Sequence, residues 1–221
     1  MKVYGLTPFT MQDFPDRLAA IVWIGGCNFR CPYCHNPEIV FGKNSLAFED
    51  VERFLQRRIK RLDGVVLSGG EPTLHPHIVE IAQRIKSLGF ALKLDTNGTK
   101  PAVIQELLQR ELLDFVALDI KAPAPKYEEV TKADLFDEVL KSLELLIGSK
   151  VELEVRTTVH TALLDEKDIE AIGKLLVSMG YKGTYYVQNF VEAPKLLGSL
   201  GPQERLLEPI ALDLAISYRN F

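Results

Sequence analysis

Short apolar runs alternate along the chain with longer stretches in which apolar residues recur every three or four positions. The short runs have the length of buried strands, and the longer stretches have the period of amphipathic helices. Six strands are predicted in this way, at residues 19–24, 65–67, 90–94, 115–118, 151–155 and 184–187. Helices are predicted at 51–62, 78–88, 103–108, 135–146 and 169–179, and a last apolar stripe runs from 206 to 214.

The alternation of strands and helices predicts an α/β fold with parallel strands and outer helices. Six such units are too few for the closed eight-stranded barrel, and they suit a doubly wound sheet or a partial (β/α)6 TIM-type barrel. No Ser- or Gly-rich linker divides the chain, so we expect a single domain. Residues 1–18 would be an N-terminal extension, 19–200 the six βα units and 203–218 a C-terminal helix.

Composition and charge narrow the class of protein. The 221 residues carry a net charge of −4, which gives no electrostatic footprint for nucleic acid. No apolar run approaches the length of about 18 residues that crosses a membrane, and the first residues do not resemble a signal peptide. We therefore expect a cytoplasmic protein that binds neither nucleic acid nor membranes, and whose reduced cysteines have a metal or redox role.

The only three cysteines, Cys27, Cys31 and Cys34, form one C-x3-C-x2-C loop after the first predicted strand. A structural zinc ion or a fully ligated iron–sulfur cluster takes four protein ligands, so three thiolates favour a cluster with one open iron. Three alternatives are a Cys31–Cys34 redox pair, haem attachment at Cys-Pro-Tyr-Cys-His, and zinc with His35 as fourth ligand. The redox pair leaves Cys27 unused, haem attachment requires export, and adjacent Cys34 and His35 can hardly reach one tetrahedral ion.

Polar and glycine residues follow the other predicted strands. In a parallel α/β fold the carboxyl ends of the strands share one rim, where sites form. The residues at these positions are Ser68-Gly69-Gly70-Glu71, Asp95-Thr96-Asn97, Asp119, Lys121, Arg156, His160 and Gln188. Any one of them could be a simple cap or turn residue, and His160 is expected to be structural. A diglycine, two aspartates and a lysine beside a thiolate loop favour a binding site.

These motifs resemble those of the radical S-adenosylmethionine (SAM) superfamily. The cysteine loop, with the aromatic Tyr33 before its last cysteine, resembles the superfamily signature, and Gly69-Gly-Glu-Pro72 resembles its second motif. Cys34-His-Asn-Pro37, Leu94-Asp-Thr-Asn-Gly98 and Asp119-Ile-Lys121 are similar to motifs of the activating enzymes of glycyl radical proteins. The subgroup that activates anaerobic ribonucleoside-triphosphate reductase is the most similar, and the resemblance extends over most of the chain.

The resemblance implies a [4Fe-4S] cluster on the three cysteines and SAM chelated to its open iron. Lys121 would pair with the carboxylate of SAM, and Asp95 and Asp119 would face its ammonium group or a monovalent cation nearby. Arg156 would contact SAM or form an internal ion pair with Asp119 or Glu154.

Further contacts to SAM are implied for residues of the other loops. Gly69 and Gly70 would let the backbone approach the methionyl part, and Tyr33 and His35 would meet the adenine. The remaining contacts are expected from Glu71, Asn97 and Gln188. Gln188 lies in Val187-Gln-Asn-Phe190, where activators of pyruvate formate-lyase carry a Tyr-His instead.

The implied function is that of an oxidoreductase. It would cleave SAM reductively to a 5′-deoxyadenosyl radical, which takes hydrogen from a glycine of a partner glycyl radical enzyme. A flavodoxin or ferredoxin would donate the electron, and the gap of an open six-stranded barrel would admit the glycine loop. The alternatives are a radical SAM enzyme acting on a small molecule, similar to the deazaguanine synthase, a non-catalytic iron–sulfur module, and a zinc-stabilised structural protein.

Overall fold

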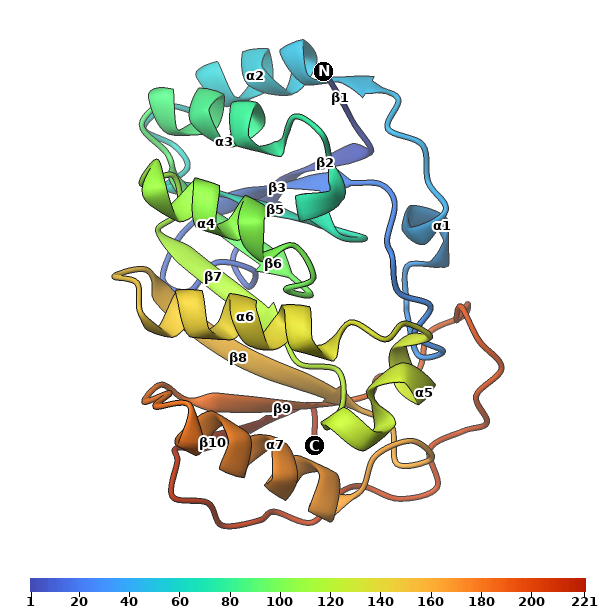
Figure 1. Ribbon diagram of the computed structural model, residues 1–221. Coiled ribbons are helices and arrows are strands. Elements are labelled where there is room, and N and C mark those ends of the chain that lie inside the picture. The colour runs from blue at the N-terminus through green and yellow to red at the C-terminus, as the bar shows by residue number, and fades with distance from the viewer.

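A computed structural model describes residues 1–221 as one α/β domain whose centre is an eight-stranded sheet (Figure 1). The strand order is β10-β9-β8-β7-β6-β5-β3-β2, and every neighbouring pair is parallel except β2 and β3. The strands are β2 (Gly5–Thr10), β3 (Ala19–Ile24), β5 (Gly64–Gly69), β6 (Ala91–Thr96), β7 (Phe115–Asp119), β8 (Glu152–Val159), β9 (Tyr185–Asn189) and β10 (Ile216–Arg219). A separate two-stranded ribbon pairs β1 (Lys2–Val3) with β4 (Leu46–Ala47). The predicted parallel α/β fold with six βα strands is confirmed.

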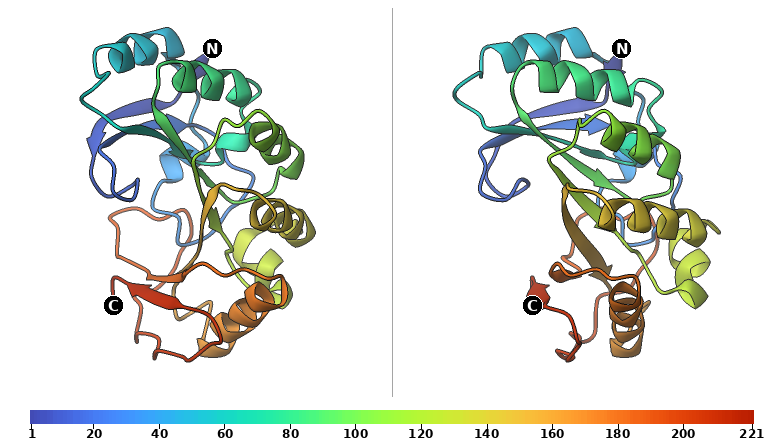
Figure 2. Two further views of the ribbon diagram at one scale, coloured as in Figure 1. Left: turned by 90° about the vertical axis from the view of Figure 1, so that its left-hand side faces the viewer. Right: turned by 60° about the vertical axis from the view of Figure 1, so that its left-hand side comes forward.

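The longer helices lie on one side of this sheet (Figure 2). They are α2 (Phe48–Gln56), α3 (Ile78–Ser87), α4 (Pro101–Gln109), α6 (Phe136–Ile147) and α7 (Glu166–Ser178). The other helical segments are the short helices α1 (Pro37–Val40) and α5 (Tyr127–Thr131) and the 3₁₀ turns η1 (Pro72–Leu74) and η2 (Ala124–Lys126). Local signals fix their ends. Pro101 occupies the first turn of α4, and Asp165 and Asp168 form a capping box that begins α7. Gly89 and Gly180 follow α3 and α7 with positive φ, which a glycine adopts without strain.

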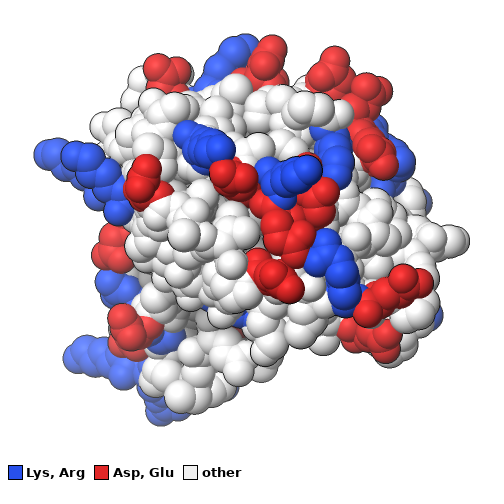
Figure 3. Space-filling model, turned by 90° about the horizontal axis from the view of Figure 1, so that it is seen from below, with Lys and Arg blue, Asp and Glu red and all other residues white.

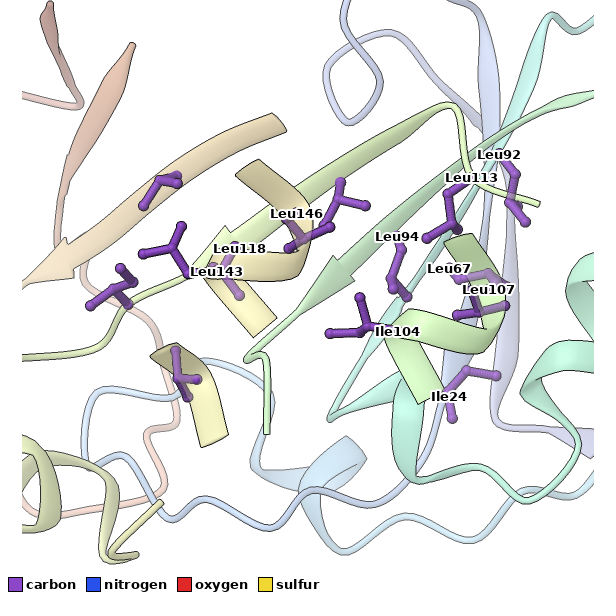
Figure 4. Close-up of a cluster of buried hydrophobic side chains, with 14 of the residues drawn as sticks. Ile24, Leu67, Leu92, Leu94, Ile104, Leu107, Leu113, Leu118, Leu143 and Leu146 are labelled. Carbon is purple, nitrogen blue, oxygen red and sulfur yellow. The ribbon is translucent and has the colours of Figure 1, made fainter. Parts of the chain in front are cut away.

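The main core fills the space between the sheet and the helices. Leucine and isoleucine side chains from β5, β6 and β7 meet those of α4 and α6 (Figure 4). Leu67, Leu94 and Leu118 on the strands and Ile104 and Leu107 on α4 are fully buried. Burial of such a side chain is worth roughly 1.5–3 kcal/mol, so this layer holds the strands in register.

A second, smaller apolar cluster covers the other face of the sheet. Phe14, from the turn between β2 and β3, packs there with Ile21, Val66 and Phe115. The predicted N-terminal extension therefore belongs to the sheet: its β2 pairs with β3, and its turn fills the floor of the partial barrel. The carboxyl ends of the strands lie at the opposite end of this face.

The C-terminal segment differs from the prediction. Residues 203–218 do not form a helix, because Pro209 lies inside the apolar stripe, lacks an N–H and would clash with the preceding turn. Leu207 is buried against the core, Leu212 lies over Gly173 of α7, and Ile216–Arg219 forms β10. The sixth unit is therefore a strand without a following helix, and β10 extends the sheet instead.

Two further features concern the helices and the surface. None of its helices has both the length and the apolar character that crossing a membrane requires. On the face seen from below, acidic and basic side chains are interspersed (Figure 3).

Candidate active site

A cavity of about 440 Å³ lies at the carboxyl ends of the strands. Its wall receives residues from all six predicted strand–loop junctions, as the shared rim of a parallel sheet requires. The predicted site residues in the wall are Cys27, Cys31, Tyr33, Cys34, His35, Gly69, Gly70, Asp95, Asn97, Asp119, Lys121, Arg156 and Gln188. Of the predicted set only Glu71 is missing from the wall.

Ser68 and Thr96, which were predicted to lie at the rim, also belong to the wall. Other residues of the wall had no predicted role, namely Trp23, Phe29, Asn36, Val40, Thr158, Asn189, Val191 and Asn220. The alternation of side chains along a strand could have indicated Thr158, two positions after Arg156 on β8. Nothing local could have indicated Asn220, because the strand that precedes it was not predicted.

The cysteine loop is held by backbone contacts to two distant segments. The amide of Arg30 donates to the carbonyl of Thr131 at the end of α5 (2.8 Å). The segment 191–201, here called the strap, crosses the loop from the other side (Figure 1). In the strap, the amide of Leu197 donates to the carbonyl of Cys34 (3.1 Å) and that of Gly198 to the carbonyl of Pro32 (3.0 Å). The loop that carries the thiols is therefore fixed on both flanks.

The donor set fits an iron–sulfur cluster better than a single ion. Three thiols face one cavity, and the amide of Phe29 donates to Sγ of Cys27 (3.4 Å). No three His, Cys, Asp or Glu side chains converge closely enough to hold one metal ion. A cluster needs no such convergence, because each thiolate binds a different iron, whereas zinc gathers its ligands around one point.

The surroundings of the thiols also affect their protonation. Burial raises the pKa of Cys27, and it raises the pKa of Cys31 to about 11, while the ammonium group of Lys121 opposes both shifts. Without metal these two thiols are therefore mostly protonated at neutral pH. Iron would have to displace their protons as it binds, because the thiolate is the ligand.

The diglycine permits close packing of backbone against backbone. Gly69 has a φ of +135°, and a Cβ there would collide with the carbonyl oxygen of Ile24 on β3. A Cβ at Gly70 would collide with the carbonyl oxygen of Gly26 in the cysteine loop. Both glycines line the cavity as predicted, but the contacts that require them are to the protein's own β3 and cysteine loop.

Glu71 lies behind the wall and not in it. Its side chain is fully buried, and its Oε1 accepts hydrogen bonds from the amide of Thr73 (3.0 Å) and the hydroxyls of Thr73 (2.5 Å) and Thr96 (2.8 Å). Its Oε2 accepts from the amide of Asn97 (2.6 Å). Burial raises the pKa of Glu71, and these hydrogen bonds oppose the shift. The predicted contact to a cofactor is therefore replaced by a brace that positions the loop after β6.

Five buried charges form a continuous ladder on the cavity side of β6, β7 and β8. Nε of Arg156 donates to Oδ1 of Asp119 (2.6 Å), and Nζ of Lys121 lies 3.0 Å from its Oδ2. A second guanidinium nitrogen of Arg156 lies 3.6 Å from Oδ1 of Asp95, and Nζ of Lys93 lies 3.0 Å from the same oxygen. These side chains are only 5% to 18% exposed. Three cations thus face two carboxylates.

The ladder contains one of the two predicted internal ion pairs of Arg156, whose predicted contact to SAM stays a prediction. Its internal partner is Asp119, which lies directly opposite in the register of β7 and β8, whereas Glu154 pairs with Arg219 on β10. Burial alone would raise the pKa of Asp119, but Arg156 and Lys121 hold it well below its ordinary range. Burial would likewise lower the pKa of Lys121, but Asp119 and Cys31 raise it above its ordinary value. Asp119, Lys121 and Arg156 therefore all remain charged at neutral pH.

Aromatic rings close the side of the cavity beside the thiols. Tyr33 is 5% exposed and its buried hydroxyl has no hydrogen-bond partner. The ring of His35 lies 5.2 Å from that of Phe190, which also meets the ring of His160 at 4.9 Å. His160 is fully buried, and its Nε2 lies 3.1 Å from the carbonyl oxygen of Gly201. His160 is a structural residue that contacts the strap, as expected, whereas the Tyr33 hydroxyl has no hydrogen-bond partner within the protein.

A parallel sheet with three thiols and a charged rim at one end defines the class of protein. Residues 21–176 match the radical SAM superfamily, and the chain belongs to it. The superfamily uses a [4Fe-4S] cluster and SAM, so these two predicted cofactors are confirmed at the level of the family.

Two relatives within the superfamily are similar in sequence to this chain. A protein of Methanocaldococcus jannaschii named as a candidate glycyl-radical enzyme activating enzyme (MJ1227) is 38% identical over 179 residues, which cover 78% of this chain and 74% of that protein. The pyruvate formate-lyase-activating enzyme of Clostridium pasteurianum is 31% identical over 177 residues, covering 76% and 72%.

Among solved structures, SuiB of Streptococcus suis with bound SAM superposes with a TM-score of 0.66 at 13% identity. The superposition covers 88% of this chain and 48% of SuiB, so this chain spans about half of that protein. The likeness shows the shared fold.

Proposed function

We propose that the protein activates a glycyl radical enzyme by taking a hydrogen atom from one of its glycines. The observation that carries this proposal is the open sheet. Its edges are β2 and β10, which do not pair, so the cavity at the strand ends has an unclosed side. A glycine offers only backbone for attack, and its loop must therefore enter the site. The names of the two relatives as activating enzymes support the same activity.

The residues present assign a role to each part of the cavity. Cys27, Cys31 and Cys34 would hold the cluster, which when bound supplies one electron to the SAM sulfonium and so yields methionine and a 5′-deoxyadenosyl radical. Lys121 reaches the thiol side of the ladder and would bind the SAM carboxylate by a charged hydrogen bond. Asp119 lies beside it and would receive the SAM ammonium group.

The remaining residues orient SAM and limit the path of the radical. Tyr33 and His35 would contact the adenine, and the strap beside them would exclude water from the reacting carbon. The radical takes the α-hydrogen of the glycine and leaves as 5′-deoxyadenosine, so that the unpaired electron stays on the glycine. The ring and backbone contacts hold the adenosyl group within reach of that one hydrogen.

The partner that we propose is the anaerobic ribonucleoside-triphosphate reductase, on the resemblance of Cys34–Pro37 and Asp119–Lys121 to that subgroup. The electron would come from a flavodoxin or ferredoxin, because one electron is consumed for each SAM cleaved. We place the reaction in the cytoplasm and expect no nucleic-acid partner.

Electron paramagnetic resonance of the reaction mixture tests this function. The reconstituted and reduced protein is incubated anaerobically with SAM and the reductase, and a glycyl doublet is expected on the reductase. A reductase with its radical glycine changed to alanine is the matched control and should give no doublet. SAM cleavage with no radical on the intact reductase would refute the function and would favour a small-molecule substrate.

A further inference from the structure

Lys93 is a buried cation that the proposed chemistry does not use. It lies on β6, two positions before Asp95, so both side chains project from the same face of the strand into the barrel. Only 5% of its side chain is exposed. An uncompensated ammonium group in such a place is costly, and its contacts must account for it.

Those contacts connect the floor of the barrel to the wall of the cavity. Nζ of Lys93 donates to the carbonyl of Asp13 in the N-terminal turn (2.5 Å), and it lies 5.6 Å from the centre of the Phe115 ring. It also lies 3.0 Å from Oδ1 of Asp95, an oxygen that accepts no hydrogen bond. Lys93 therefore acts on Asp95 through its charge, while its directional hydrogen bond goes to the turn.

A small cation at the two aspartates would enter an already compensated site. Asp119 has Arg156 and Lys121, and Asp95 has Lys93 at 3.0 Å and Arg156 at 3.6 Å. The five groups sum to one surplus positive charge, so a free monovalent ion would be repelled. The ammonium group of SAM differs, because it would enter together with a carboxylate that Lys121 binds. The monovalent cation expected from the sequence does not fit this arrangement.

We propose that Lys93 is the built-in cation of the site: its ammonium group neutralises Asp95 and takes the place of a bound monovalent ion. Without that charge, Asp95 would keep only the longer contact to Arg156, whose Nε is engaged by Asp119. The space left by Lys93 would then be a cation site. The protein is therefore independent of Na⁺ and K⁺, and neutralising Lys93 makes it depend on them.

Lys93→Gln removes the charge and keeps an N–H donor that can face the Asp13 carbonyl, on a side chain one atom shorter. In tetramethylammonium chloride, whose cation is too large to enter, the variant without metal should melt about 6–12 °C below the wild type. KCl or NaCl at equal ionic strength should restore at least half of that loss and leave the wild-type Tm unchanged. Lys93→Arg keeps the charge and should not respond to the salt.

A double variant separates this cation effect from general salt stabilisation. Lys93→Gln with Asp95→Asn removes both charges, and its Tm should no longer distinguish K⁺ from tetramethylammonium. A Lys93→Gln protein whose Tm is the same in all three salts would overturn the proposal. If the variant does not fold in any of them, sodium NMR of the wild type decides: a saturable Na⁺ site would overturn the proposal, and its absence is the expected result.

SAM cleavage provides a second readout, which rests on the proposed function. The wild-type rate should be equal in the three salts, and the Lys93→Gln rate should rise at least tenfold on addition of K⁺. The thermal measurements need neither cluster nor SAM. A failure of the proposed function would therefore leave the cation effect intact, whereas a failure of this inference would leave the glycyl radical doublet intact.

Discussion

Glu71→Gln distinguishes a structural brace from a cofactor contact. The carboxylate accepts N–H hydrogen bonds at both oxygens, from Thr73 at Oε1 and from Asn97 at Oε2. A glutamine can keep the bonds at one oxygen only, and its NH₂ group must then face a buried donor. The substitution therefore removes at least one charge-assisted hydrogen bond and leaves a buried amide, that of Asn97 or that of Thr73, without an acceptor.

The size of the effect follows from these bonds. Losing a hydrogen bond to a charged group while a buried donor stays unsatisfied costs roughly 2–3 kcal/mol. For a chain of this length each kcal/mol shifts Tm by about 2–4 °C, so we expect a fall of about 4–12 °C. Asn97 should also move, because Glu71 fixes its backbone, and SAM affinity should fall as a secondary effect.

Urea unfolding of the metal-free protein, followed by circular dichroism, measures the free energy directly. Glu144→Gln is the matched control, since Glu144 is exposed on α6 and should change stability by less than about 0.5 kcal/mol. If Glu71→Gln left the unfolding free energy unchanged and lowered only SAM affinity, Glu71 would be a ligand contact and the brace would be wrong.

Three further predictions concern the cluster, the charged ladder and the surface. Cys31→Ser should lose both the absorbance of the reconstituted cluster and SAM cleavage, because two thiolates cannot retain it; full iron and sulfide content in the variant would contradict this. Lys121→Met should keep the cluster but weaken SAM binding by about 1.5–3 kcal/mol, or roughly 10–150-fold in Kd by calorimetry, whereas the exposed Lys141→Met should bind normally. Hydrogen bonds from Arg205 and from the amide of Glu208 lower the pKa of Glu166 from 4.5 to about 2, so its stabilisation is present above pH 4.5 and is lost as the pH falls toward 2. Wild type should therefore exceed Glu166→Gln in unfolding free energy near neutral pH, and that difference should shrink between pH 5 and pH 3; a constant difference would refute the assignment.

The strands and their rim could be predicted because each depends on a short stretch of sequence. Leu67, Leu94 and Leu118 stand in apolar runs of strand length, and each run is followed within two residues by glycine or aspartate. Parallel strands bring those ends together whatever the details of packing. This is why residues far apart in the chain, such as Cys27 and Asp119, could be assigned to one site before any contact was known.

The C-terminal region was mispredicted because its helical period conflicted with a local breaker. Leu206, Leu207, Ile210 and Leu214 have helical spacing, but Pro209 forbids the helix, and the edge of β9 offers hydrogen bonds to an extended segment. That pairing depends on an unfilled sheet edge about 30 residues away, which no local pattern reports. The position of Asn220 in the cavity wall also depends on the pairing of β10 with β9.

The partners of the buried charges depend on register, which the sequence leaves open. From the sequence alone Arg156 could pair with Glu154, two positions earlier on the same strand, or with Asp119 on the preceding strand. The parallel pairing of β7 and β8 sets Arg156 opposite Asp119, and β10 brings Arg219 to Glu154. The neighbouring strands therefore determine which carboxylate Arg156 binds.

The same register gives the ladder a direction. Its charges alternate from Lys93 at the floor of the barrel to Lys121 beside the thiols. Each terminal lysine has one carboxylate partner, but Lys93 also donates to the carbonyl of Asp13, whereas Lys121 donates only to Asp119 and lies beside Cys31. The surplus positive charge of the ladder is therefore expressed at its thiol end. An incoming carboxylate would be drawn to the end of the ladder where Cys27, Cys31 and Cys34 would hold the cluster, and Lys93 at the other end would keep Asp95 from competing for that charge.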